Sequence, residues 1–187
     1  MKLKSKVLII AGSDSSGGAG IQADIKTVTA LGSYAMTAVT AVTSQNTKGV
    51  KVITSIPIRN LQKQITMVLD DIGADSVKIG MLHNTSTIKC VHRILRKYKI
   101  KNIVLDPVMI SKGGSRLVNS NSIKYLKKLL LPLCSIVTPN IPEAEVLTGY
   151  SISNKSDMIK AAKKIINMGA KNVLLKGGHL KNKMIFD

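Results

Sequence analysis

The sequence predicts an α/β protein in which βαβ units build a largely parallel sheet. Three observations predict this class. Short apolar runs of strand length alternate with segments of helical periodicity. A glycine-rich segment joins the first apolar run to the first helix. Polar or glycine-rich residues follow most of the predicted strands, and in an open parallel sheet such strand ends converge on one crevice.

Strands are predicted where a short apolar run is bounded by turn residues. Residues 34–44 are rich in Val, Thr and Ala, which is typical of a buried strand. Residues 50–55 fit a short edge strand, which Pro57 ends because proline has no N–H to donate. In order, the predicted strands are 6–11, 34–44, 50–55, 76–79, 101–106, 135–138 and 172–176.

Helices are predicted where apolar residues recur every three or four positions, as they do clearly in 59–72. Gly32 and Gly169 are placed to end two of these helices, since glycine readily adopts the left-handed conformation. Lysines and arginines near the end of 85–98 suit the helix dipole. In order, the predicted helices are 21–31, 59–72, 85–98, 120–131, 142–148 and 155–168.

The composition fits one globular domain, 1–187, with a substantial core, because the chain has 187 residues of which 44% are hydrophobic. It shows no apolar run of membrane-spanning length and no signal-peptide pattern at its N-terminus. Cys90 and Cys134 lack metal-ligand spacing, and their apolar surroundings predict reduced, buried thiols. These features predict a cytoplasmic protein without a membrane partner.

The net charge of +18 raises the question of nucleic-acid binding. The cations are mostly lysines spread along the chain, and aromatic residues, which stack on bases, make up only 3% of it. We therefore expect no specific nucleic-acid partner, although non-specific binding at low salt remains an expectation.

The glycine-rich segment 11–24, AGSDSSGGAGIQAD, is the most informative part of the chain. A strand, such a loop and a helix N-terminus together present N–H groups to a polar or anionic ligand. The segment lacks the Gly-Lys-Ser/Thr of a phosphate-binding P-loop. It matches the loose dinucleotide pattern, but no acidic residue between Asp24 and Asp70 is available to hold a ribose. A tight turn without a ligand is the remaining alternative.

Five further polar or glycine-rich groups follow predicted strands, and turns alone do not require so many. We expect them to face the same crevice as the glycine-rich segment. They are Gln45-Asn46, Gly80-Met81, Asp106, Asn140 with Glu143, and 176–179.

Taken together, these motifs resemble the hydroxymethylpyrimidine/phosphomethylpyrimidine kinases of thiamine biosynthesis. The matching segments occur in the family's order and are 11–24, 44–47, 78–81, 104–109, 138–144 and 176–179. The resemblance implies a ribokinase-like fold with three layers around a mostly parallel sheet. It also implies ATP-dependent phosphorylation of 4-amino-5-hydroxymethyl-2-methylpyrimidine and then of its monophosphate.

For the pyrimidine, the resemblance implies that Gln45 hydrogen-bonds the aminopyrimidine edge, since an amide offers both a donor and an acceptor. The Gly12 backbone and Asp24 would line the same pocket, and Met81 and Val108 would contact the ring. The alternatives are a solvated strand end for Gln45, a first-turn helix carboxylate for Asp24, and core packing for the two apolar residues.

For the nucleotide, the resemblance implies that Asp106 and Glu143 organise Mg²⁺ and phosphates, because a hard cation prefers oxygen ligands. Asn140 and Lys176 would face the nucleotide phosphates. The alternative for Glu143 is a first-turn carboxylate that follows Pro142.

The sequence also departs from the family. The Gly-Thr-Gly-Cys-type loop that forms the family's anion hole does not occur here, so no catalytic residue is identified. The resemblance implies that this loop and the rest of the domain lie beyond Asp187. Since losing one such donor typically slows a reaction about 10²- to 10³-fold, we expect residues 1–187 alone to be at most weakly active. The chain is then a part of a longer protein or the product of a decaying reading frame.

Three other functions stay open on the sequence. They are a pyridoxal or pyridoxine kinase of the same fold, a pyrimidine-binding protein without catalysis, and, more remotely, a Rossmann oxidoreductase. A homodimer that uses 40–57 is a further expectation.

Overall fold

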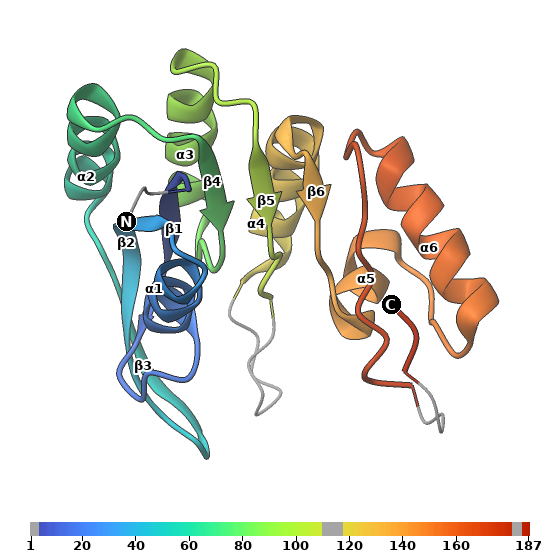
Figure 1. Cartoon of the computed structure of the whole chain (residues 1–187). Coiled ribbons are helices and arrows are strands. Elements are labelled where there is room, and N and C mark those ends of the chain that lie inside the picture. Colours follow the sequence, from blue (N-terminus) through green and yellow to red (C-terminus); the bar gives the residue numbers. More distant parts are fainter. Residues whose placement is uncertain (1–3, 110–117, 181–184) are drawn as a thin grey trace.

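The computed structural model describes residues 4–109, 118–180 and 185–187. Within these residues, six strands form one sheet in the order β3-β2-β1-β4-β5-β6 (Figure 1). Only β3 runs antiparallel, and it forms one edge. The strands are β1 (Lys6–Asp14), β2 (Tyr34–Asn46), β3 (Gly49–Ser55), β4 (Ser76–Ile79), β5 (Ile103–Leu105) and β6 (Ile136–Val137).

The helices agree with the predicted periodicity, with one exception. They are α1 (Gly20–Ala30), α2 (Ile58–Asp71), α3 (Thr85–Lys97), α4 (Ser120–Tyr125), α5 (Ile141–Thr148) and α6 (Lys155–Asn167). The single helix predicted over 120–131 is wrong in its second half, where a π-helical turn, Leu126–Leu130, leads into a 3₁₀ turn. Pro132 explains the change, because proline has no N–H for an α-helical bond and its ring clashes with the preceding turn.

The order in which the chain adds strands to the sheet determines which helices cover each face. From β1 the chain moves one way to β2, whereas from β4 it moves the other way to β5 and β6. Because parallel crossovers are right-handed, α1 must lie on one face of the sheet and α3 and α4 on the other. Figure 1 shows this arrangement, with α1 on the near side. The reversal between β1 and β4 is a topological switch point, where such sheets bind ligands.

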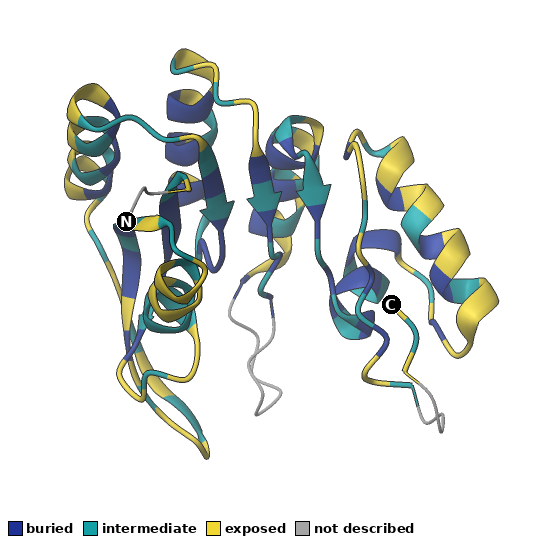
Figure 2. Cartoon of the chain, viewed as in Figure 1, coloured by how far each residue is buried: buried dark blue, intermediate teal, exposed yellow. Residues whose placement is uncertain are grey.

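The main hydrophobic core lies on the α3 face of the sheet. Leu8 and Ile10 of β1 and Val77 and Ile79 of β4 are fully buried there. Figure 2 shows buried positions along β4 and on α3, whereas α1 is intermediate or exposed. On the opposite face, α1 has no fully buried residue, and the β4 residue Lys78 is only half-buried. The fold is therefore held mainly from one side, while the other side carries polar groups toward the switch point.

The strand predicted over 172–176 is reduced to two isolated bridges beside β6. Leu174 donates its N–H to Val137, and Lys176 donates its N–H to Pro139, so the segment follows β6 in parallel. Pro139 has no N–H to return, and the ladder is interrupted at that point. The prediction places this segment correctly and overstates its hydrogen bonding.

Two composition-based expectations can be compared with the structure. Cys90 and Cys134 are both buried and free, as predicted. In the part of the chain that the structure describes, no helix is long and apolar enough to span a bilayer. Val42 and Val52, near the β3 edge, are about half exposed, and the homodimer through 40–57 stays a prediction.

Candidate active site

A cavity of about 450 Å³ opens at the carboxyl ends of β1, β2, β4 and β5, across the switch point. Six of the nine site residues predicted from the sequence line it, although they come from four separate segments of the chain. They are Gly12, Asp24, Gln45, Met81, Asp106 and Val108.

The glycine-rich loop is organised by Asp14, whose side chain is only 3% exposed. One carboxylate oxygen accepts hydrogen bonds from the Ser16 N–H at 2.8 Å and the Ser16 hydroxyl at 2.7 Å. The other accepts from the N–H groups of Gly18 at 3.1 Å and Ala19 at 2.8 Å. Burial alone would raise the pKa of Asp14, but these hydrogen bonds outweigh it and lower the pKa.

This arrangement narrows one expectation from the sequence, while the first turn of α1 has no side-chain cap. The glycine-rich pattern predicts that the loop presents its N–H groups to a ligand, but those of Ser16, Gly18 and Ala19 are donated to Asp14 instead. The sequence reasoning misses Asp14 although a signal is present. An Asp followed by small residues and glycines is typical of a side chain that bonds its own downstream backbone.

The start of α1 is locked onto the end of β1. Gly20 has a φ of +57°, and a Cβ at this position would collide with the carbonyl oxygen of Gly12. Gln22 accepts the N–H of Asp14 at 2.9 Å and donates its amide to the Ser13 hydroxyl at 2.7 Å. The glycine therefore permits a close backbone approach that fixes the wall of the cavity.

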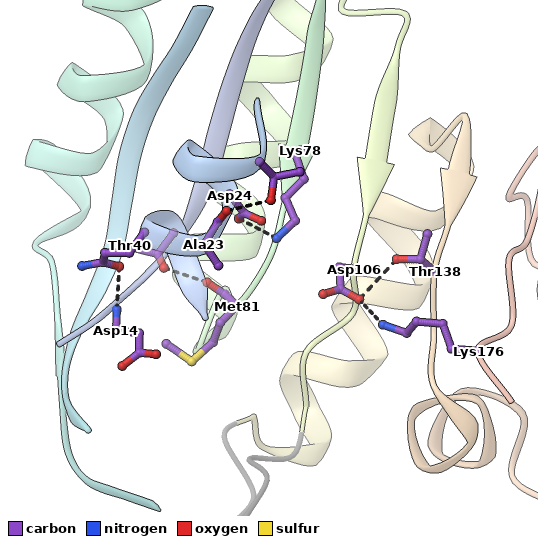
Figure 3. Close-up of polar contacts among 11 residues, drawn as sticks. Asp14, Ala23, Asp24, Thr40, Lys78, Met81, Asp106, Thr138 and Lys176 are labelled. Atoms are coloured by element: carbon purple, nitrogen blue, oxygen red, sulfur yellow. Dashed lines mark hydrogen bonds and ion pairs between the residues drawn. The ribbon is translucent and has the colours of Figure 1, made fainter. Parts of the chain in front are cut away.

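Asp24 pairs with Lys78, with 2.7 Å between its carboxylate oxygen and the lysine Nζ (Figure 3). The two side chains are 22% and 24% exposed, so the pair is largely shielded. Both residues line the cavity, and the pair joins α1 to β4. The sequence reasoning misses Lys78, although a charged residue between Val77 and Ile79 in a short apolar strand is a sign that the structure supplies a partner.

The residues predicted to contact a ring line the same cavity. The Thr43 hydroxyl lies 3.2 Å from the side-chain oxygen of Gln45 and 2.9 Å from the carbonyl oxygen of Ser13. Met81 is 8% exposed, and its carbonyl accepts the Thr40 hydroxyl at 2.7 Å (Figure 3). Met81 thus combines both alternatives weighed from the sequence, since it is packed in the core and also lines the cavity.

Asp106 connects the cavity to a second charged group. One of its carboxylate oxygens accepts from Lys176 Nζ at 2.8 Å and from the Thr138 hydroxyl at 3.2 Å (Figure 3). The Lys176 side chain is 41% exposed and that of Asp106 is 27% exposed. Three of the predicted site residues do not line the cavity itself and lie further along the sheet, beyond Asp106. They are Asn140, Glu143 and Lys176.

Asn140 and Glu143 form a capping box at the start of α5. The Asn140 side chain accepts the Glu143 N–H at 2.9 Å, and the Glu143 carboxylate accepts the Asn140 N–H at 2.9 Å. Glu143 is the first-turn carboxylate that the alternative interpretation described, yet it is only 3% exposed. Burial, aided by the charge of Asp106, raises the pKa of Glu143 to about 7, against the hydrogen bonds and Lys176.

The oxygen donors at this end suit Mg²⁺, which takes few protein ligands, rather than a metal that is held by protein side chains alone. Among the described residues, no group of three or more His, Cys, Asp or Glu side chains is placed to hold a metal. Mg²⁺ usually needs only one or two carboxylates and completes its shell with phosphates and water. Asp106 and Glu143 offer two carboxylates close enough for their charges to interact.

Solved structures match this fold closely. A phosphomethylpyrimidine kinase from Clostridium difficile has a TM-score of 0.89 and 48% identity, with 97% of this chain and 78% of that chain covered. A Staphylococcus aureus pyridoxal kinase, solved with AMP-PCP and pyridoxal, has a TM-score of 0.89 and 37% identity, with 100% and 67% covered. The fold is therefore that of the ribokinase-like small-molecule kinases.

Within this class, the phosphomethylpyrimidine kinase family model matches residues 14–187, and the chain belongs to that family. A hydroxymethylpyrimidine/phosphomethylpyrimidine kinase of Bacillus subtilis is 49% identical over 174 residues, which cover 93% of this chain and 64% of that protein. The chain spans 68% of a Rhizobium meliloti kinase of the same name and 32% of a probable bifunctional thiamine-biosynthetic enzyme of Oryza sativa.

Proposed function

We propose that the chain forms the pyrimidine pocket, and part of the nucleotide site, of a kinase that uses ATP. The substrate is 4-amino-5-hydroxymethyl-2-methylpyrimidine and then its monophosphate, which yields the diphosphate for thiamine biosynthesis. One observation carries the proposal: Gln45, Met81 and Val108 line one cavity together with Asp106, which is paired with Lys176. Family membership and the named activities of the relatives support it.

The cavity suggests how the substrate is oriented. The Gln45 amide would pair with the amino group and ring nitrogen, while Met81 and Val108 would contact the faces of the ring. The hydroxymethyl group would then point toward Asp106 and Lys176, where charges are available. Catalysis of phosphoryl transfer depends mainly on positioning and on stabilising charge, and these two demands fall on the two ends of the cavity.

At the nucleotide end, Asp106 and Glu143 would hold Mg²⁺ through oxygen, and the ion would neutralise phosphate charge when bound. Lys176 would contact a phosphate as a point charge, after exchanging its partner Asp106 for the nucleotide. The Asn140 side-chain oxygen is bonded to the Glu143 N–H, so the part that remains for phosphates is its amide NH₂ group.

A pyridoxal kinase is the second candidate, because pyridoxal kinases share this fold at 37% to 39% identity. Pyridoxal also presents a hydroxymethyl group on a nitrogen heterocycle, so the cavity volume alone does not separate the two substrates. The family match favours the pyrimidine.

Calorimetry on the purified chain tests the proposal. We expect the pyrimidine alcohol to bind, and pyridoxal and a nicotinamide dinucleotide to compete poorly. Preferential binding of pyridoxal would replace the proposed substrate, and absence of pyrimidine binding would overturn the proposal. A parallel assay with Mg-ATP measures turnover, which we expect to be weak for residues 1–187 alone, so that binding without turnover agrees with the proposed pocket.

A further inference from the structure

We propose that Asp14 determines specificity in this cavity. Its carboxylate accepts the loop N–H groups that a phosphate would otherwise bind, so this end of the cavity excludes phosphate and accepts an uncharged ring. The inference deepens the proposed function and rests on it for the identity of the ring. It assigns a role to a residue that the sequence motifs alone left without one.

Asp14 accepts the N–H groups of the loop before α1. A glycine-rich loop before a helix N-terminus normally attracts phosphate, because free N–H groups and the helix dipole favour negative charge. Here both oxygens of Asp14 lie against the loop that precedes α1, with four hydrogen bonds from Ser16, Gly18 and Ala19. The carboxylate is almost fully buried. The N–H groups of Ser16, Gly18 and Ala19 are therefore satisfied without a ligand, whereas the first turn of α1 itself has no side-chain cap.

The loop end of the cavity also has charged side chains around Asp14. Asp14 and Asp24 both line this end of the cavity, and Lys78, the cation beside them, is already paired with Asp24. Each end of the cavity has two carboxylates and one paired lysine, but Lys78 is only 24% exposed and is held by Asp24. At the Asp106 end, by contrast, Lys176 is 41% exposed and can reach an incoming anion. The charges therefore impose one direction on the substrate, with the ring at the loop and the phosphate at Lys176.

A phosphate titration of the ¹⁵N-labelled chain tests the inference without the pyrimidine. In the unaltered chain, inorganic phosphate should leave the amide signals of Ser16, Gly18 and Ala19 unchanged. In Asp14→Ala, the same amides should respond, with phosphate binding about tenfold tighter or more. Equal responses in both chains, or a folded variant that gains no phosphate response, would overturn the inference.

Asp157→Ala is the matched control. Asp157 also accepts both the N–H and the hydroxyl of one serine, Ser153, at 3.2 and 2.9 Å, but it lies at the start of α6 and away from the cavity. Its loss removes the same charge from the chain, and the three loop amides should stay unresponsive. A phosphate response there would mean that net charge, rather than Asp14, excludes the anion.

Two additions keep the test decisive. If Asp14→Ala does not fold, the titration of the unaltered chain still overturns the inference when its loop amides bind phosphate, and Asp14→Asn offers an uncharged residue of equal size. We expect Asp14→Ala to bind the pyrimidine more weakly, because the loop wall loses four hydrogen bonds. Formate, a small carboxylate, should restore that affinity to a folded variant, and a failure of this rescue would count against the inference. If the unaltered chain binds no pyrimidine, the proposed function fails, while the phosphate titration still decides the role of Asp14.

Discussion

The two ends of the cavity are stabilised in different ways. At the glycine-rich loop, the polar groups of Asp14 and its neighbours bond one another and leave a rigid wall. At the other end, Asp106 and Glu143 lie near each other, with Lys176 paired to only one of them, and the pKa of Glu143 rises to about 7. At the first end, the N–H groups of Ser16, Gly18 and Ala19 are bonded without a ligand. The second end carries a carboxylate whose charge is disfavoured, and binding a cation there would relieve this.

We therefore expect one end of the cavity to recognise the shape of the ring and the other to bind the charge of the nucleotide. A rigid wall of backbone and one internal carboxylate suits an uncharged ring, whose position must be fixed before phosphoryl transfer. Exchangeable ion pairs suit a nucleotide, because the protein's charges can pair with phosphates instead of with each other. Substitutions at each end should therefore have separable effects.

The largest effect is expected from Gly20→Ala at the rigid end. The new Cβ would meet the backbone oxygen of Gly12, which cannot move without displacing the loop, and the φ of +57° adds strain. We expect a loss of about 2 to 4 kcal/mol in the free energy of unfolding, together with loss of pyrimidine binding. Urea unfolding and calorimetry measure the two quantities.

Gly149→Ala is the control for strain alone, because Gly149 has a φ of +83° but no neighbouring atom lies within 4 Å of the place that a Cβ would take. It should lower the free energy of unfolding by about 1 kcal/mol and leave pyrimidine binding intact. Equal losses in the two variants would show that the contact with Gly12 is unimportant.

The next effect concerns the charged end and depends on pH. The pKa of Glu143 is about 7 in the folded chain, against an ordinary value of 4.5, so the folded state holds its proton more tightly. Below pH 4.5 both states are protonated and nothing is lost. As the pH rises to about 7, the free energy of unfolding should fall by about 3 kcal/mol and then level off.

Glu143→Gln removes this titration and keeps an oxygen to accept the Asn140 N–H. The variant should be more stable than the unaltered chain at about pH 8, with a flatter profile across the range in which Glu143 titrates. Glu145→Gln, on the same helix, is the control and should keep the original profile, because Glu145 accepts the Ile152 N–H outside the site. Thermal unfolding across about pH 4 to 8 decides, and an unchanged profile in Glu143→Gln would contradict the raised pKa.

The sequence predicts most of the fold because its apolar periodicity is regular. The strand over 76–79 and the start of the helix at Thr85 are predicted to the residue, since turn residues bound each run. Some strand bounds differ, since β1 runs to Asp14 rather than ending at residue 11, and two further errors fall at prolines. Around Pro132 the end of one helix becomes a π-helical turn and then a 3₁₀ turn. Pro139 interrupts the pairing of the last segment with β6. Their effects depend on which hydrogen bond is lost, and periodicity does not contain that information.

Some residues of the site can be predicted from the sequence and others cannot. Residues after strand ends can be predicted well, because the topology of a parallel sheet brings them together. Asp14 and Lys78 escape sequence reasoning because their roles depend on partners. Asp14 is bonded by its own loop, and Lys78 pairs with Asp24, which lies 54 positions earlier in the chain. Such pairings become evident only when the side chains are placed in space.

Replacing each of the two lysines tests the division between ring and phosphate directly. Lys78→Met should weaken pyrimidine binding about tenfold and leave Mg-ATP binding nearly unchanged, because Asp24 loses the partner that fixes it beside the ring. Lys176→Met should weaken Mg-ATP binding about tenfold and spare the pyrimidine. Calorimetry with each ligand measures the four affinities.

Lys78→Arg keeps the charge and should recover part of the pyrimidine affinity. If both lysine variants weaken the same ligand, the two ends of the cavity do not act separately and the proposed orientation of the substrate is wrong. Circular dichroism confirms that each variant is folded before its affinities are compared.

The smallest effect is expected from Thr43→Val, which keeps the shape of the side chain and removes a hydroxyl 3.2 Å from the Gln45 side-chain oxygen. If this hydroxyl orients the amide toward the ring, pyrimidine affinity should fall about threefold, against about tenfold for Gln45→Leu. Combining the two should cost no more than Gln45→Leu alone, since Thr43 acts through the amide. Additive losses would mean that Thr43 supports the cavity independently of Gln45. Thr148→Val, which removes a buried hydroxyl that donates to Ala144 within α5, should leave the affinity unchanged.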